Sequence, residues 1–178
     1  TAVCVGSTTT LANAQVGGTW SSSDVAVATI AANGVVNGLT AGSATITYTF
    51  TNASGCTTNV TTALVVNALP VPTVALSGPT TFCAGGSVTL TAPAASSYLW
   101  STGETTQSVT PNSTVMIDVI VTTAGCSATS APIAVTVNAL PTPVVTTNNV
   151  AICQGTAATL TSTPAAAYLW NNGSTNAS

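Results

Sequence analysis

Apolar and polar residues alternate along most of this chain, with the two-residue period of a β-strand that faces a core on one side. Val88 and Leu90, for example, alternate with threonines, so the pattern predicts that the two aliphatic side chains point inward. The longest run of this kind covers residues 115–123 and places Asp118 on the solvent face. Leu, Glu, Lys and Gln, which favour helices, are scarce, whereas Thr, Ala, Val and Ser make up more than half of the chain. The sequence therefore predicts an all-β protein.

The middle third of the chain shows several short strands separated by turn residues. These strands are predicted at 73–77, 87–92, 98–100, 107–110, 115–123 and 133–138, with a hairpin turn at Ala124-Gly125. Short strands at this spacing, with a Cys…Trp…Cys order, are typical of an immunoglobulin-like β-sandwich.

An internal repeat divides the chain. A Cys-x-Gly motif opens each copy, Thr-Leu follows six residues after the Cys, and a Trp follows nine or ten residues after the Leu. The three copies contain Cys4 with Trp20, Cys83 with Trp100, and Cys153 with Trp170. Because these Trp residues recur at one position on a predicted inner strand, we expect them to be core residues and not carbohydrate-binding platforms.

Two copies continue to a Gly-Cys pair, at Cys56 and Cys126, and end in Asn-Ala-Leu-Pro. The two tetrapeptides begin at Asn67 and Asn138, which are 71 residues apart. This period predicts an immunoglobulin-like module at 1–68 that lacks its first strand, a second at 69–139, and the N-terminal part of a truncated third at 140–178. Alternating Pro residues after each tetrapeptide favour an extended linker, so the tandem modules are expected to be arranged end to end.

Modules of about 70 residues have small cores and commonly need covalent support. We expect the disulfides Cys4–Cys56 and Cys83–Cys126, each tying one pole of a sandwich, and expect the partner of Cys153 to lie beyond residue 178. Free buried thiols are the alternative. A metal site is disfavoured because the chain has neither a Cys-x-x-Cys motif nor any His. Since disulfides persist in oxidising compartments, the cysteines predict export from the cell.

The chain has no Lys, Arg or His, and its only acidic residues are Asp24, Glu104 and Asp118. Without basic residues it lacks the positive charge with which proteins bind nucleic acids or anionic membrane surfaces. No apolar run reaches the ~20 residues needed to cross a bilayer, so we expect no membrane insertion in this segment. A Ser nucleophile would have no His or Lys base, and the three acids offer neither a catalytic pair nor a strong calcium site. We therefore expect no enzyme activity, no cofactor and no metal.

Residues 18–49 resemble the group 2 bacterial immunoglobulin-like (BIG2) domain. The resemblance rests on Trp20-Ser-Ser-Ser-Asp24, Val27-Ala-Thr-Ile30, Gly38-Leu39, Ala41-Gly42 and Ala44-Thr-Ile-Thr47. The second module, with Tyr98-Leu-Trp-Ser-Thr-Gly-Glu104, is more weakly similar to PKD-type and related Ig-like repeats, although it lacks their acidic turn. The array as a whole resembles giant secreted surface adhesins of Bacteroidota.

These resemblances imply a non-catalytic structural or adhesive segment of a cell-surface or extracellular filament protein. The partners they imply are neighbouring modules of the same chain, and further copies of the chain or a surface glycan or protein. Two alternatives remain open: a module that binds a glycan or protein ligand, and an accessory region of a large secreted enzyme.

Overall fold

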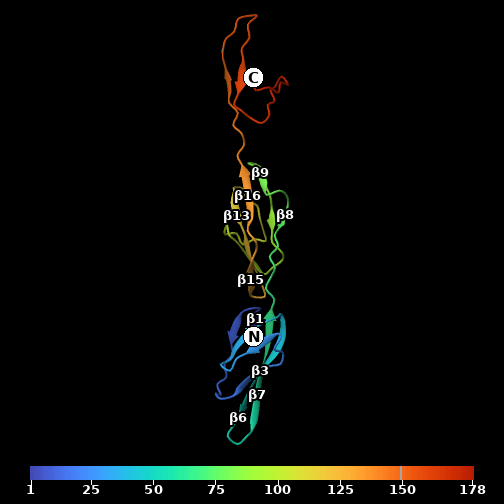
Figure 1. Cartoon of the computed structure of the whole chain (residues 1–178), viewed down its shortest axis with the longest axis vertical. Coiled ribbons are helices and arrows are strands. Elements are labelled where there is room, and N and C mark those ends of the chain that lie inside the picture. The colour runs from blue at the N-terminus through green and yellow to red at the C-terminus, as the bar shows by residue number, and fades with distance from the viewer. Residues whose placement is uncertain (149) are drawn as a thin grey trace. The chain divides into compact units, whose positions relative to one another are not determined.

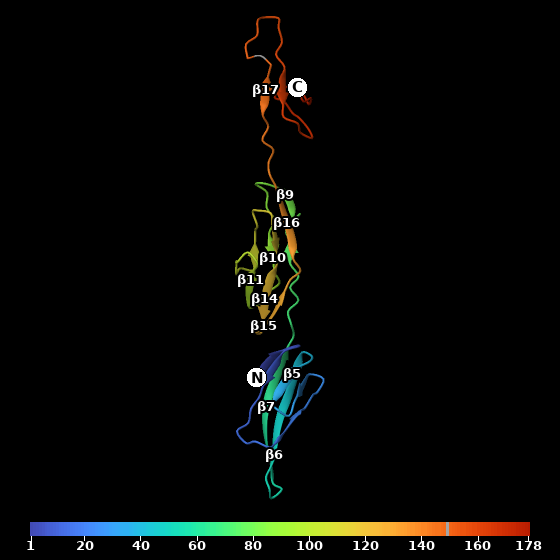
Figure 2. The ribbon, with the colours of Figure 1, turned by 60° about the vertical axis from the view of Figure 1, so that its left-hand side comes forward.

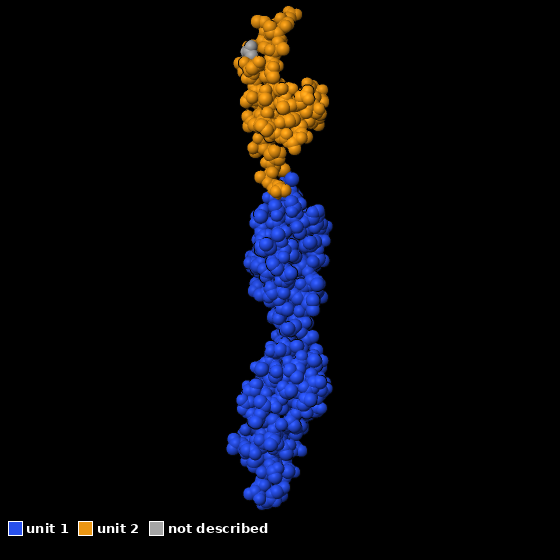
Figure 3. Space-filling view, in the orientation of Figure 1, with its two compact units in different colours: residues 1–137 blue, residues 138–178 orange. Residues whose placement is uncertain are grey.

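The computed structural model describes residues 1–148 and 150–178 (Figures 1 and 2). Every regular element among them is a β-strand, so the chain is all-β, as the alternation predicted. The chain divides into two compact units, Thr1–Val137 and Asn138–Ser178, coloured separately in Figure 3. Unit 1 contains two sandwiches, which we call the first sandwich (β1–β7) and the second sandwich (β8–β16).

The first sandwich consists of two sheets, with strand orders β1-β7-β6-β3 and β2-β5-β4. Its strands are β1 (Ala2–Cys4), β2 (Thr8–Thr10), β3 (Thr19–Ser22), β4 (Ala28–Ile30), β5 (Val35–Gly38), β6 (Gly42–Thr51) and β7 (Thr57–Asn67). Buried aliphatic side chains from both sheets, including Val36, Ile46 and Leu64, form the core between them. The alternation of the sequence places these residues inward, whereas Thr45 beside Ile46 and Val65 beside Leu64 are exposed.

The long β6–β7 hairpin dominates the first sandwich. Its two strands pair antiparallel from Gly42 opposite Val66 to Thr51 opposite Thr57. The short strand β1 then lies on the other edge of β7 and runs parallel to it, with Cys4 opposite Asn67. This arrangement places Cys4 at the end of the sandwich that is remote from the hairpin tip.

The second sandwich comprises three three-stranded sheets, with orders β12-β10-β8, β11-β14-β15 and β13-β16-β9. Its strands are β8 (Ala75–Leu76), β9 (Thr81–Cys83), β10 (Leu90–Thr91), β11 (Ser97–Trp100), β12 (Ser108–Val109), β13 (Val115–Ile117), β14 (Val119–Thr123), β15 (Cys126–Thr129) and β16 (Ile133–Asn138). The sequence pattern did not predict β9 or β15. The core forms around Trp100, which is only 1% exposed, and includes Val88 and Leu90 on the inward face that the alternation predicted.

The single strand predicted at 115–123 is two strands, which corrects that expectation. The chain changes sheets at Asp118, because β13 pairs with β16 whereas β14 pairs with β11 and β15. At the break, the backbone N–H of Asp118 donates to Ser101 Oγ (3.0 Å), and the Ser101 N–H donates to the Asp118 carbonyl (2.9 Å). The inward face is nevertheless continuous, since Ile117 and Val119 are both buried.

Unit 2 contains the strands β17 (Val145–Thr147) and β18 (Leu160–Ser162), which pair antiparallel. Its local hydrogen bonds repeat those of the second sandwich. The indole N–H of Trp170 donates to the carbonyl of Asn176 (2.7 Å), as that of Trp100 donates to the carbonyl of Thr106 (2.8 Å). The repeated sequence therefore forms the same turn after the Trp in both units.

Candidate functional site

The cysteine of each Cys-x-Gly motif is held by the same tight turn. The N–H three residues after the cysteine donates to its carbonyl, at 2.9 Å for Cys4, 2.9 Å for Cys83 and 3.1 Å for Cys153. The Gly of each motif has a positive φ, between 77° and 92°, which residues with a Cβ adopt only with strain. The motif is therefore explained by backbone geometry, and it presents the cysteine in one local conformation.

The fold places the two cysteines of the first sandwich at opposite ends of β7. Cys4 lies opposite Asn67, the last residue of β7, whereas Cys56 immediately precedes Thr57, the first residue of that strand. At ~3.3 Å per residue, a strand of 11 residues separates the two positions by roughly 35 Å. A disulfide requires Cα atoms within about 7 Å, so Cys4 cannot pair with Cys56 in this fold.

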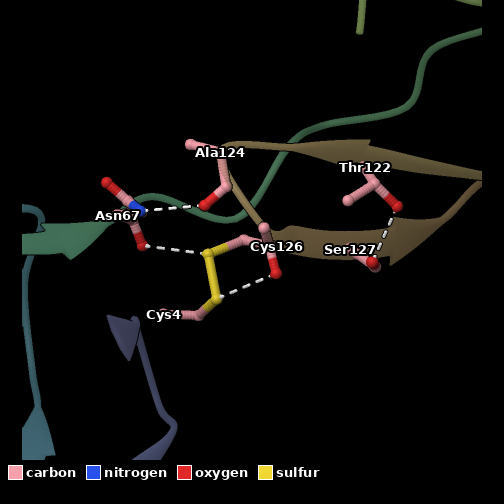
Figure 4. The surroundings of a disulfide bond; sticks show 7 residues. Cys4, Asn67, Thr122, Ala124, Cys126 and Ser127 are labelled. Atoms are coloured by element: carbon pink, nitrogen blue, oxygen red, sulfur yellow. Dashed lines mark hydrogen bonds between the residues drawn. A yellow bond between two sulfur atoms is a disulfide. The ribbon is translucent and has the colours of Figure 1, made fainter. Parts of the chain in front are cut away.

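The structure instead joins Cys4 to Cys126, with their Cα atoms 5.7 Å apart (Figure 4). The expected pairs Cys4–Cys56 and Cys83–Cys126 are therefore wrong, because each bonded cysteine takes a partner in the neighbouring sandwich. Cys56, Cys83 and Cys153 are free thiols, and all three are exposed. The bond thus connects two modules and does not staple either one internally.

The cysteine bond lies within a small set of polar backbone contacts, which we call the junction: Cys4, Asn67 and the hairpin residues 124–126. The Asn67 side-chain amide donates to the carbonyl of Ala124 (3.0 Å), and Cys126 Sγ lies 3.9 Å from the Asn67 carbonyl (Figure 4). Cys4 Sγ lies 3.8 Å from the Gly125 carbonyl. Asn67 is the first residue of the repeated Asn-Ala-Leu-Pro tetrapeptide, so the tetrapeptide supplies a contact as well as a linker.

The hairpin that carries Cys126 is turned by two residues with positive φ, Ala124 (51°) and Gly125 (80°). Two such residues in succession are the requirement of a type I′ turn, whose twist matches that of the paired strands. Strand β15 begins at Cys126, which pairs with Thr123 across the hairpin. The turn therefore sets Cys126 at the tip, where its sulfur reaches the first sandwich.

The three Trp residues differ in burial. Trp100 is buried in the core, whereas Trp20 and Trp170 are partly exposed. Trp20 packs against Tyr48, its cross-strand neighbour, with ring centroids 4.6 Å apart. The two rings border a hollow of about 300 Å³ that is also lined by Asn13, Gln15 and Asn33. Among the described residues no protein acceptor receives the Trp20 indole N–H, unlike those of Trp100 and Trp170.

The three acidic side chains do not form a common site in the structure. Asp24 Oδ1 accepts hydrogen bonds from the N–H groups of Ala26 (2.9 Å) and Val27 (3.3 Å), which caps a turn. Glu104 accepts a hydrogen bond from the hydroxyl of Thr102 in the turn after Trp100. In the part of the chain that the structure describes, no three His, Cys, Asp or Glu side chains gather where they could hold a metal ion.

Comparison with known proteins bears on the first sandwich. Residues 3–67 match the family model of the bacterial Ig-like domain (group 2). The matched segment covers nearly all of β1–β7, so this sandwich is Ig-like in sequence as well as in fold. The fold class is tandem immunoglobulin-like sandwiches. No curated protein matches the chain.

The solved structures to which the chain is similar have low sequence identity to it and TM-scores below 0.5. Murine CEACAM1b is 15% identical with a TM-score of 0.34, and the match covers 64% of this chain and 68% of that one. The N-terminal four Ig domains of Dscam1 isoform 6.9 are 13% identical (TM-score 0.32; 78% and 43% covered). The S-layer protein rSbsC(31-844) is 13% identical (TM-score 0.31; 83% and 28% covered). The chain thus spans less than half of the Dscam1 fragment and little more than a quarter of the S-layer protein. Among the described residues, none forms a helix long and apolar enough to cross a bilayer.

Proposed function

We propose that this chain is a non-catalytic structural segment of a secreted surface or filament protein, and that its modules are coupled covalently to resist tension. The observation that carries this proposal is the Cys4–Cys126 bond between two sandwiches. A bond within one module would stabilise that module alone. A disulfide between two modules instead links one module covalently to the next.

The position of the bond determines how tension passes through the chain. Cys4 and Cys126 are separated by 122 positions in sequence, but their Cα atoms are 5.7 Å apart. Tension that enters before Cys4 and leaves after Cys126 therefore passes through the sulfur atoms, and residues 5–125 lie outside the path. The hydrogen bonds and cores of those residues are then not required to resist the pull.

The chemistry of the chain supports an extracellular location. A disulfide persists where the redox environment is oxidising, and the matched Ig-like family is bacterial. The resemblance to giant secreted adhesins of Bacteroidota leads us to propose a cell surface or extracellular filament as the site of action. There the chain would connect an anchoring part to an adhesive part of a longer assembly.

Single-molecule force spectroscopy tests the proposal directly. When the oxidised chain is pulled by its two termini, we expect residues 5–125 to add no length to the extended chain. Reduction should release them, and 122 positions at ~3.6 Å each add roughly 400 Å of contour length. The Cys4→Ala variant should show this extra length without reductant, and Cys56→Ala, which removes a free thiol, should behave like the parent. Equal extension of oxidised and reduced parent would contradict the proposal.

A further inference from the structure

The hollow beside Trp20 and Tyr48 is formed by the first sandwich alone. Every residue that lines it lies between Thr10 and Tyr48, so neither the junction nor unit 2 contributes to its walls. Trp20 belongs to β3, which forms one edge of its sheet, whereas β1 forms the opposite edge. The hollow therefore lies away from the edge that carries Cys4.

The walls of the hollow are held in place by close backbone contacts. The Tyr48 hydroxyl accepts a hydrogen bond from the N–H of Gly18 (2.7 Å) and donates one to the carbonyl of Gln15 (2.6 Å), which ties the loop at 15–18 to the sheet. A Cβ at Gly18 would overlap the Tyr48 ring, and a Cβ at Gly34 would overlap the carbonyl of Leu11. A ligand would thus meet a site whose shape is already formed, which lowers the entropy cost of binding.

The indole N–H of Trp20 is a donor that the protein leaves open. In the other two copies of the repeat, the indole N–H is received by a carbonyl six residues after the Trp, that of Thr106 for Trp100 and that of Asn176 for Trp170. Within residues 1–148 and 150–178, no buried side-chain nitrogen or oxygen lacks a hydrogen-bond partner. Since the Trp20 N–H has no protein acceptor there, it must be accessible to solvent.

Two asparagines add further donors to the same hollow. The Oδ1 of Asn13 accepts a hydrogen bond from the N–H of Gln15 (2.9 Å), and the Oδ1 of Asn33 accepts one from the N–H of Val35 (3.2 Å). These bonds orient both side chains, while their Nδ2 amides find no acceptor in the part of the chain that the structure describes. The lining contains no charged residue. The hollow therefore combines an aromatic ring with several oriented, uncharged N–H donors.

We propose that this hollow binds one sugar unit of an uncharged glycan. Sugar hydroxyls accept hydrogen bonds from such donors, and the C–H face of a sugar ring packs against an aromatic ring such as that of Trp20. Carboxylated or sulfated sugars are disfavoured, because the chain has no Lys, Arg or His to pair with their charge. A volume of about 300 Å³ is small for a ligand site, which suits a single ring. The site gives the first sandwich an adhesive role of its own, independent of the Cys4–Cys126 bond.

Saturation-transfer NMR on the full chain tests the proposal, because it detects weak binding. The probes are the neutral trisaccharides cellotriose, maltotriose, mannotriose and N-acetylchitotriose, with trigalacturonic acid as the acidic counterpart. We expect at least one neutral trisaccharide to receive magnetisation through one of its rings. Its Kd should be about 1 mM, since a single ring makes few contacts. Trigalacturonic acid should show no transfer.

Two conservative variants locate the site. Asn33→Asp keeps the Oδ1 that accepts from Val35 but removes the amide donor, and Trp20→Phe keeps an aromatic ring but removes the N–H. Each should weaken binding about fivefold, because a sugar hydroxyl loses its donor. The matched controls are Asn59→Asp, on the exposed part of β7 outside the hollow, and Trp170→Phe in unit 2. Both controls should bind like the parent, and thermal melts verify that all four variants are folded.

Three results would overturn the inference. The first is the absence of transfer to every neutral trisaccharide at millimolar concentration. The second is equal binding of trigalacturonic acid, which would show that the hollow does not select uncharged sugars. The third is parent-like binding by folded Asn33→Asp and Trp20→Phe, or loss of binding in Trp170→Phe, since either would place the sugar elsewhere.

Discussion

At the scale of single residues, burial separates side chains that look equivalent in sequence. Trp20, Trp100 and Trp170 follow the same motif, but only Trp100 is enclosed by a core, at 1% exposed. Trp20 lies at the side of its core, where its ring contacts Tyr48 and borders a polar hollow. The sequence identified a repeated aromatic position, and the packing of each module decided how much of the ring is covered.

Replacement of these rings should therefore have unequal effects on stability. We expect Trp100→Ala to lower the free energy of unfolding by about 3–5 kcal/mol, because it leaves a cavity in a closed core. Trp20→Ala should cost less, since part of that ring is already in water. Urea denaturation followed by circular dichroism measures both, and a larger loss for Trp20→Ala would contradict this account of the core.

At the scale of elements, the alternation predicted which faces are buried but not which strands are partners. Residues 115–123 kept their inward face although the chain changes sheets at Asp118. The short strands β9 and β15 were missed because three or four residues carry little periodicity. These two strands hold Cys83 and Cys126, so the elements that sequence reasoning missed are those that position the cysteines.

The hairpin turn gives a prediction at this scale. Gly125 has a φ of 80°, whereas Gly78 has open space around its Cα and no positive φ. Gly125→Ala should lower the free energy of unfolding by about 1 kcal/mol, because alanine is strained in that conformation. Gly78→Ala should be neutral or slightly stabilising, because it reduces the freedom of the unfolded chain. Thermal melts of the two variants test this, and equal shifts would show that the turn is not strained by a Cβ.

At the scale of the whole molecule, the bond between Cys4 and Cys126 makes two sandwiches one covalent unit. It closes a loop with a sequence separation of 122, for which the chain-entropy relation gives up to about 5 kcal/mol of stabilisation. A bond within one module would close a shorter loop and would leave the neighbouring module free.

Peptide mapping distinguishes the bond between modules from bonds within each module. Cleavage before Asp24 and Asp118 under non-reducing conditions gives fragments 1–23, 24–117 and 118–178. The Cys4–Cys126 bond joins the first fragment to the third and leaves the second free. The pairs Cys4–Cys56 and Cys83–Cys126 would instead join all three, and mass spectrometry would show a single product. Trypsin is unsuitable because the chain has no Lys or Arg.

The sequence by itself determined the all-β class, the inward faces of the strands, the repeat and the absence of basic groups, because each is a local or compositional property. Only the tertiary structure decided how the cysteines pair. The repeated Cys-x-Gly and Gly-Cys motifs indicate that disulfides can form. The simplest assumption is that each disulfide joins two cysteines of one module. The 11 residues of β7 hold Cys4 and Cys56 at opposite ends of one sandwich, so the nearest partner of Cys4 is Cys126 of the next sandwich. Distance in space decided the pairing, and distance along the chain did not.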